Sequence, residues 1–200
     1  MRQATAGALT GEPPAAVPAP LTAPDAGAAA CRDFYATLAS GVTVVTTQGP
    51  DGPAGSTASA VTSLSADPPL LLVCLGTGSR TLAAIEAEGR FAVNLLRQSQ
   101  RARAELFADP RADSAERFAA VRHRRVLSVP VLEDGLGWSV CLTEDLRRYG
   151  DHCLVVGRLA AVSTAAGRPL LWHGRSFHAL ADRDATRTAG PAHRPPMEEA

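Results

Sequence analysis

The chain has 200 residues, a formal net charge of zero and a sequence pI near 7.0, so its overall charge would attract neither a nucleic acid nor an anionic membrane surface. All 20 of its Lys and Arg residues are arginines. The absence of lysine excludes a P-loop lysine, a Schiff-base lysine and a lysine general base. A hydrophobic share of 46% over this length is typical of one globular domain.

The cysteines and histidines do not form a metal-binding pattern. No CxxC pair occurs, and no two histidines are spaced four residues apart. We therefore expect no metal site. No run of about eighteen apolar residues predicts a membrane-spanning helix, and the N-terminus lacks the apolar region of a secretion signal. The sequence thus predicts a cytoplasmic protein without a membrane anchor.

The composition divides the chain into three parts. Residues 1–29 are rich in Ala, Pro, Gly and Thr, and residues 182–200 carry charge and proline without a periodic apolar face. Neither segment can bury enough apolar surface to offset the entropy lost on ordering. We expect a disordered N-terminal extension, a folded domain over residues 30–181 and a disordered C-terminal tail.

The first half of the domain predicts a short helix followed by strands. CRDFYATLAS places Phe34, Tyr35 and Leu38 at helical spacing. GVTVVTT and GSTASAVTSLS, separated by a Gly-Pro-Asp-Gly-Pro turn, predict a β-hairpin. The apolar run LLLVCLG then predicts a central strand that is buried on both faces.

The second half adds helices that cover a sheet. Ser79 can cap the helix RTLAAIEAEG, and FAVNLL returns as a strand. Residues 99–120 predict two helical pieces that are broken near Pro110. LGWSVCLTEDLRR, DHCLVVGRLAAVST and PLLWHGRSFHAL predict three further strands. Many strands joined by short turns favour a mainly β fold with peripheral helices, an antiparallel barrel rather than a parallel sheet.

Two segments offer groups that can bind a phosphate. In residues 56–65, alternation along one extended strand places Thr57, Ser59 and Ser63 on the same face. That face is either a polar binding groove or the solvent side of an edge strand. GTGSRT lacks the third glycine of a dinucleotide fingerprint, so Ser79 and Arg80 mark either a phosphate-binding helix start or a plain cap.

The ordered set of motifs resembles a known family. GVTVVTT, TASAVTSLSADPPLLLVCL, GSRTLAAI, GRFAVNLL, LFAD, VPVL, LGWSVCL, GDHCLVVGRL and PLLWHGR together are similar to the short-chain flavin reductases that supply two-component flavin-dependent monooxygenases. The similarity extends over about residues 32–180. It implies an FMN-binding split β-barrel of Greek-key type that forms a homodimer with flavin near the subunit interface.

The resemblance also assigns residues to a site. The implied flavin-binding residues are Thr57, Ala58, Ser59, Thr62, Ser63, Cys74, Leu75, Ser79, Arg80 and Thr81. His152 of the GDH motif is implied at the nicotinamide, with Phe107 packed nearby. Trp172-His173 stands where the family often has a tyrosine, so the choice between FMN and FAD stays open.

The implied activity is the reduction of FMN or FAD by NADH or NADPH for a separate monooxygenase. Hydride transfer between two cofactors needs orientation rather than acid–base groups, so we expect no catalytic acid or base. The chief alternative is a flavin- or haem-binding split-barrel carrier or sensor without turnover. A third interpretation, an oxidase of the pyridoxamine-phosphate type, is disfavoured by the absence of lysine and by the GDH motif.

Overall fold

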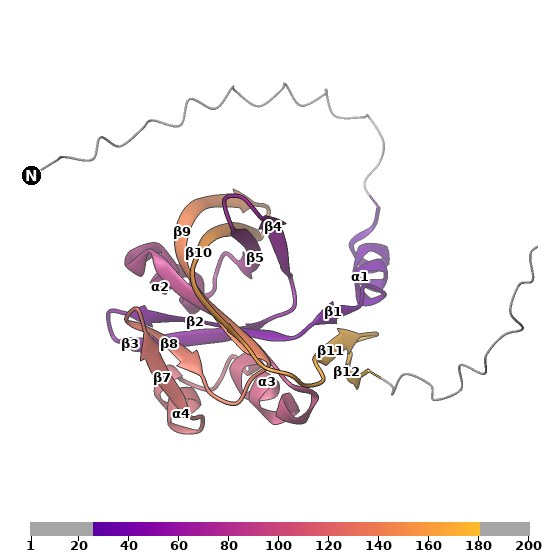
Figure 1. Ribbon diagram of the computed structural model, residues 1–200. Coiled ribbons are helices and arrows are strands. Elements are labelled where there is room, and N and C mark those ends of the chain that lie inside the picture. Colours follow the sequence, from indigo (N-terminus) through magenta and orange to yellow (C-terminus); the bar gives the residue numbers. More distant parts are fainter. Residues whose placement is uncertain (1–25, 181–200) are drawn as a thin grey trace, which may run out of the picture.

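Strands rich in β-branched residues form one large antiparallel sheet in the computed structural model, which describes residues 26–180 (Figure 1). Thr43–Gly49 (β2) pairs with Gly52–Ala58 (β3) on one side and with Arg90–Leu95 (β6) on the other. The predicted extension and tail lie outside the described residues, apart from residues 26–29. A helix already begins there, at Ala28.

The other strands of the seven-stranded sheet are Val61–Ser65 (β4), Leu70–Gly76 (β5), Gly137–Tyr149 (β9) and His152–Thr164 (β10). Their order is β3-β2-β6-β9-β10-β5-β4, and every pairing is antiparallel. The two edge strands, β3 and β4, are consecutive in the chain and are joined only by Ser59 and Ala60. The sheet therefore curls back on itself, which confirms the predicted antiparallel split-barrel class.

The hydroxyl-rich run 56–65 forms two strands instead of the single strand that was predicted. β3 pairs with β2, whereas β4 pairs with β5 at the opposite end of the sheet. At the break, the carbonyl oxygen of Ala60 accepts a hydrogen bond from the backbone N–H of Cys74 at 2.9 Å. Side-chain alternation does not continue through this break, so Thr57, Ser59 and Ser63 do not share one strand face.

β5 lies next to an edge of the sheet and is not buried on both faces, so this part of the prediction is wrong. Its side chains alternate, with Leu71, Val73 and Leu75 at 9%, 0% and 4% exposure and the others half-buried. Only the short strand β4 follows it in the sheet. On its half-buried face, Leu70 lines one surface groove and Cys74 lines another.

Arg80–Glu88 (α2) forms as predicted between a cap and a glycine stop. The Ser79 hydroxyl accepts a hydrogen bond from the N–H of Leu82, and Gly89 ends the helix with φ 69°. Leu82 and Ile85 pack into the core inside the sheet, against Val45 and other apolar side chains. The helix therefore fixes its N-terminus beside the end of β5.

Arg101–Ala108 (α3) and Ser114–Ala119 (α4) are the two predicted helical pieces, preceded by a 3₁₀ turn at Gln98–Gln100 (η1). Both helices pack on β3. Phe107 and Phe118 meet edge to face at 5.4 Å between ring centroids, within a second buried cluster. These helices cover the outer side of β3 (Figure 1).

The last predicted strand is a hairpin of Leu170–His173 (β11) and Ser176–Ala179 (β12). Gly174 and Arg175 both have positive φ, 57° and 60°, as a two-residue type I′ turn requires. β11 also pairs with Ser40–Gly41 (β1). A separate ribbon pairs His123–Val126 (β7) with Val129–Leu132 (β8).

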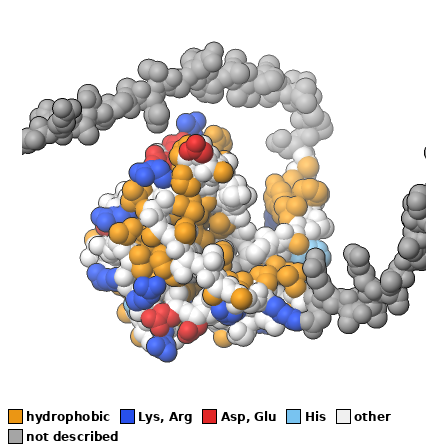
Figure 2. Space-filling view, viewed as in Figure 1, with side chains coloured by type: hydrophobic (Ala, Val, Ile, Leu, Met, Phe, Trp, Pro, Cys, Tyr) orange, Lys and Arg blue, Asp and Glu red, His pale blue; other side chains and the backbone are white. Residues whose placement is uncertain are grey.

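Ala28–Ala36 (α1) is the predicted first helix, but it has no buried residue. Phe34, Tyr35 and Leu38 are 63%, 62% and 55% exposed. Figure 2 shows hydrophobic side chains gathered over this helix, beside the main body. Among residues 26–180, no helix is both long and apolar enough to cross a membrane.

Candidate functional site

A pocket of about 320 Å³ opens at the seam of the barrel, where the end of β3 meets the end of β5. Short side chains and backbone form most of its wall, so the space stays open. Its lining residues, called the seam pocket from here on, are Ser56, Thr57, Ala58, Ser59, Ala60, Cys74, Leu75, Gly76, Ser79 and His152. An open groove is therefore present at the seam, lined by Thr57 and Ser59 but not by Thr62 or Ser63 of the predicted hydroxyl face.

The N-terminus of α2 forms one end of the seam pocket. Ser79 lines the pocket, its backbone N–H donates to the Gly76 carbonyl at 2.9 Å, and its hydroxyl accepts from Leu82 at 3.4 Å. The first N–H groups of a helix lack intrahelical partners and carry the positive end of the dipole. This end of the pocket suits an anionic group such as a phosphate.

His152 lies at the rim of the seam pocket and is held by its neighbour. Its Nδ1 lies 2.8 Å from the Asp151 carboxylate, and this hydrogen bond holds the pKa of the Asp151 carboxyl below its usual range. An ionised carboxylate only accepts hydrogen bonds, so Nδ1 carries a proton and Nε2 is left for other contacts.

The remaining walls are neutral. Burial raises the pKa of the Cys74 thiol, and the neighbouring Cys153 adds to the shift, so Cys74 is a protonated, weakly polar surface. The Ser56 hydroxyl is buried without a hydrogen-bond partner among the described residues. A Cβ built at Gly76 would approach only the Asp151 carbonyl, at 4.0 Å. A groove whose walls are neutral side chains and backbone fits a planar organic group.

The structure brings most of the predicted site residues together in the seam pocket and places the others elsewhere. Thr62 and Ser63 line a separate groove of about 420 Å³ on β4 and β5. Thr81 is 3% exposed and Phe107 is 1% exposed, so both belong to the core. The Thr57 hydroxyl donates to the Ala104 carbonyl at 2.6 Å, which anchors α3 on β3.

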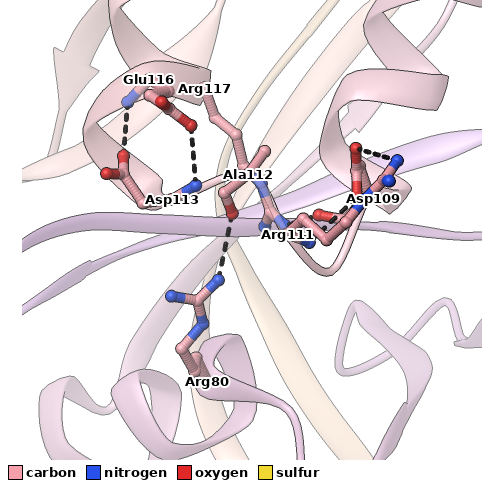
Figure 3. A network of polar contacts seen from close by, with 7 residues as sticks. All are labelled: Arg80, Asp109, Arg111, Ala112, Asp113, Glu116 and Arg117. Carbon is pink, nitrogen blue, oxygen red and sulfur yellow. Dashed lines mark hydrogen bonds and ion pairs between the residues drawn. The ribbon is translucent and has the colours of Figure 1, made fainter.

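Arg80 points away from the seam pocket into the α3–α4 connection. Its guanidinium donates to the Ala112 carbonyl at 3.1 Å (Figure 3). The neighbouring Arg117 donates to the carbonyls of Gly55 and Asp109. The Arg80 side chain also lines a groove on the far side of α2. In this position Arg80 holds the α3–α4 connection against α2.

Ser56, Ala60 and Gly76 line the seam pocket but were not predicted as site residues. Ser56 belongs to the hydroxyl-rich run, and Gly76 ends the apolar strand that precedes Ser79. The sequence therefore pointed to both segments as parts of a binding site. Which of their residues face the pocket depends on the break between β3 and β4, which local patterns do not reveal. Among residues 26–180, no cluster of His, Cys, Asp or Glu could hold a metal ion.

Fold and site together define a split-barrel protein with an open groove at its seam. The chain belongs to the family described as the flavin reductase like domain, which matches residues 35–181.

The names of proteins with similar sequences agree with this family. A "Probable flavin reductase" of Rhizobium meliloti is 42% identical over 134 residues, which cover 66% of this chain and 42% of the relative. The FMN reductase (NADH) of Ancylobacter novellus is 37% identical and is covered to 83%, with 75% of this chain matched. The reductase component of 4-nitrophenol 4-monooxygenase/4-nitrocatechol 2-monooxygenase of Rhodococcus opacus is 38% identical, with 77% of this chain and 82% of the relative covered.

A solved structure shares the fold. The NADH:FAD oxidoreductase of Streptomyces globisporus, in complex with NAD and FAD fragments, superposes with a TM-score of 0.72 at 29% identity. The match covers 77% of this chain and 93% of that chain. The chain thus spans nearly all of this solved structure, but less than half of the Rhizobium relative.

Proposed function

We propose that this protein is an NAD(P)H-dependent flavin reductase that reduces FMN or FAD and supplies the reduced flavin to a separate monooxygenase. The observation that carries this proposal is the open seam pocket, where Ser59, Ser79 and His152 meet around an uncharged groove. Relatives of this chain are named as NADH-dependent flavin reductases, and one is the reductase component of a monooxygenase.

The seam pocket fits a flavin by its chemistry. Ser79 and the start of α2 would hold the phosphate, and Ser59 with the backbone at Ala60 would contact the polyol chain. Cys74 and Leu75 offer an apolar wall to the ring. When bound, the flavin ring supplies the position that accepts the hydride of the reduced nicotinamide.

In this reaction the protein positions the two reacting rings. Two planar rings must lie in van der Waals contact, and holding them so converts an encounter of two molecules into a step within one complex. His152 lies at the rim of the pocket, 55% exposed, so it can contact a second ring that lies over the first. No described acidic pair lines the pocket.

A groove-filling substitution tests the pocket directly. Gly76→Leu should abolish flavin binding, because a side chain there would extend into the open seam pocket. Gly78→Leu is the matched control, since a Cβ at Gly78 meets nothing within 4 Å and Gly78 does not line the pocket. Flavin binding, followed by fluorescence quenching, should be lost only in the first variant; equal binding in both would place the flavin elsewhere.

Turnover is tested by mixing the purified protein with FMN or FAD and with NADH or NADPH. We expect loss of the nicotinamide absorbance with at least one pair and none without added flavin. Flavin binding without any nicotinamide oxidation would reject the reductase and leave a carrier or sensor. Oxidation of pyridoxamine phosphate without NADH would instead indicate an oxidase.

We further propose that the protein is a homodimer. The groove on β4, β5, β9 and β10 is lined mainly by apolar side chains, among them Trp138 and the 61% exposed Val162. An apolar surface of this kind is typical of a subunit interface. Val162→Glu should convert a dimer into a monomer in light scattering, whereas a wild-type monomer would contradict the proposal.

A cytoplasmic location completes the proposal. All four cysteines, Cys31, Cys74, Cys141 and Cys153, are free in the described part of the chain. Free thiols are typical of proteins in a reducing compartment. Fractionation of producing cells should recover the protein with cytoplasmic enzymes.

A further inference from the structure

A second groove, of about 410 Å³, lies between α2, the β2–β3 turn and the start of α4. We call it the α2–α4 groove. It is lined by the turn residues 49–54, by Arg80, Ala83, Ala84 and Ala87 of α2, and by Ser114. No residue lines both this groove and the seam pocket. A ligand in the α2–α4 groove would therefore occupy a site separate from the flavin site.

Most of the wall of the α2–α4 groove is apolar and made of small side chains. Ala83 and Ala87 lie about one turn apart on α2, and both are exposed. Pro50 and Pro53 border the opposite side. Because methyl groups and proline rings offer no hydrogen bonds and leave the space open, this part of the groove suits a compact apolar body.

Two guanidinium groups lie at the α4 end of the groove. Arg80 lines the groove, and its Nη2 donates to the Ala112 carbonyl at 3.1 Å (Figure 3). Arg117 lies behind the wall, because its Nη1 donates at 2.7 Å to the carbonyl of Gly55, which follows the lining residue Ala54. Burial lowers the pKa of Arg117, and the charge of Arg80 lowers it further. The two cations are thus close enough to repel each other.

The carboxylates beside this cation pair serve other partners. Asp109 pairs with Arg111 at 3.1 Å, and Asp113 caps α4 by accepting a backbone hydrogen bond at 2.7 Å. Both raise the pKa of Arg117, but neither forms an ion pair with Arg117 or Arg80 in the described part of the chain. Nε of Arg117 is also buried without a hydrogen-bond partner there. A bound anion would relieve this repulsion and supply the missing counter-ion.

We propose that the α2–α4 groove binds a small organic anion. Its carboxylate or phosphate lies between the guanidinium of Arg80 and the hydroxyl of Ser114, and its apolar body lies on the alanines of α2. A guanidinium binds either oxyanion through paired, charge-assisted hydrogen bonds. This inference goes beyond the proposed function and does not depend on it, because the reduction of flavin requires no ligand in this groove.

Titration with benzoate, phenyl phosphate and benzyl alcohol tests the site and distinguishes the two kinds of charged group. In amide NMR spectra of the full chain, the signals of Ala83, Ala87 and Ser114 should shift with an anion, with a Kd on the order of 1 mM. Neutral benzyl alcohol should cause no such shift. The tighter anion identifies the charged group of the ligand, and the absence of these shifts with both anions overturns the proposal.

Arg80→Gln tests the cation, with Arg111→Gln as the matched control. Arg80→Gln should raise the Kd of the anion about tenfold, because it removes charge-assisted hydrogen bonds. Arg111 belongs to the same α3–α4 connection, but its side chain is 89% exposed and does not line the groove. Arg111→Gln should therefore leave the Kd unchanged. Equal weakening in both variants would show attraction to the general positive charge and would overturn the site.

Ala83→Leu tests the apolar wall without changing the charge. Leucine is a good helix former, so α2 should persist, and the larger side chain should fill the groove and abolish anion binding. Thermal unfolding checks that the variant is folded. Undiminished binding of the anion by folded Ala83→Leu would show that the anion does not lie on α2.

Gly76→Leu separates this site from the seam pocket. Benzoate should bind to Gly76→Leu as it binds to the wild type, and saturating FMN should not displace it, because the two sites share no residue. Loss of benzoate in either experiment would place the anion in the seam pocket and overturn the proposal. Binding of benzoate by a protein that does not oxidise NADH would keep this site and reject only the proposed function.

Discussion

Thr77 donates two hydrogen bonds to one acceptor, the carbonyl oxygen of Asp151, from its backbone N–H at 2.9 Å and from its hydroxyl at 3.2 Å. This contact joins the residue after β5 to the turn between β9 and β10, next to the place where Gly76 pairs with His152. Asp151 in turn holds His152 at 2.8 Å. The imidazole is therefore positioned through the neighbouring strand β5.

Thr77→Val removes the hydroxyl bond and keeps the shape of the side chain. We expect the KM for NADH to rise roughly two- to tenfold, the range that corresponds to one neutral hydrogen bond. Thr77→Ser keeps the hydroxyl and should restore the wild-type KM. Steady-state kinetics with saturating FMN measures the difference, and an equal KM in all three proteins would show that this contact does not position His152.

His152→Ala should raise the KM for NADH while leaving the Kd for FMN nearly unchanged. The residue stands at the rim of the seam pocket, where the second ring is expected, and contributes no part of the phosphate end. His178→Ala is the control, because His178 is exposed on β12 and does not line the seam pocket. Equal NADH kinetics in His152→Ala and wild type would remove His152 from the site.

Local chemistry explains which elements could be predicted from the sequence. The cap at Ser79, the stop at Gly89 and the turn at Gly150-Asp151 each depend on a few neighbouring residues, and all three form as predicted. The position of β5 in the sheet depends on two partners. One is β10, which is distant in the sequence, and the other is β4, which follows the break after β3. An apolar run does not reveal whether its outer face meets side chains or an open groove.

Local sequence patterns also do not reveal which site residues meet in space. Ser59, Ser79 and His152 meet because the sheet curls, and only the family resemblance pointed to their meeting. Thr81 follows Ser79 by half a turn of helix, so its side chain points into the core. Phe107 likewise occupies the buried face of α3. A motif therefore identifies the segment that contributes to the site. The geometry of the helix or strand determines which residues of that segment face the ligand.

Arg117 should be important for stability. It is 6% exposed and donates to the backbone oxygens of Gly55 and Asp109, so it links α4 to β3 and to the end of α3. Arg117→Leu would leave both carbonyls without this donor and should lower the free energy of unfolding by about 2–3 kcal/mol. Urea denaturation measures the loss.

The control for this measurement is Arg111→Leu. Arg111 pairs with Asp109 in the same network, but its side chain is 89% exposed (Figure 3). Exposed ion pairs contribute about 0–1 kcal/mol, so this variant should unfold almost like the wild type. Equal losses in both variants would contradict the structural role of Arg117.

Gly157 allows two strands and a ring to approach closely. A Cβ at this position would lie 2.5 Å from Cζ of Phe91 and 2.8 Å from Cβ of Cys141, inside the core. Gly157→Ala should therefore destabilise the fold by about 1–3 kcal/mol through overpacking. Gly41→Ala, where a Cβ meets nothing within 4 Å, should change the melting temperature little; a large shift there as well would point to backbone effects instead.

Cys141 should make stability fall in alkaline solution. The side chain is fully buried, and burial raises the pKa of its thiol from 9.0 to about 11, an effect that the hydrogen bond to Ser139 partly offsets. Between these values the unfolded chain releases the thiol proton and the folded protein retains it, so the folded state loses stability as pH rises. The loss should reach about 2 kcal/mol near pH ~10.5. Denaturant unfolding of wild type and Cys141→Ala from pH ~8 to ~10.5 isolates this contribution, and parallel pH profiles for the two proteins would show that Cys141 does not cause it.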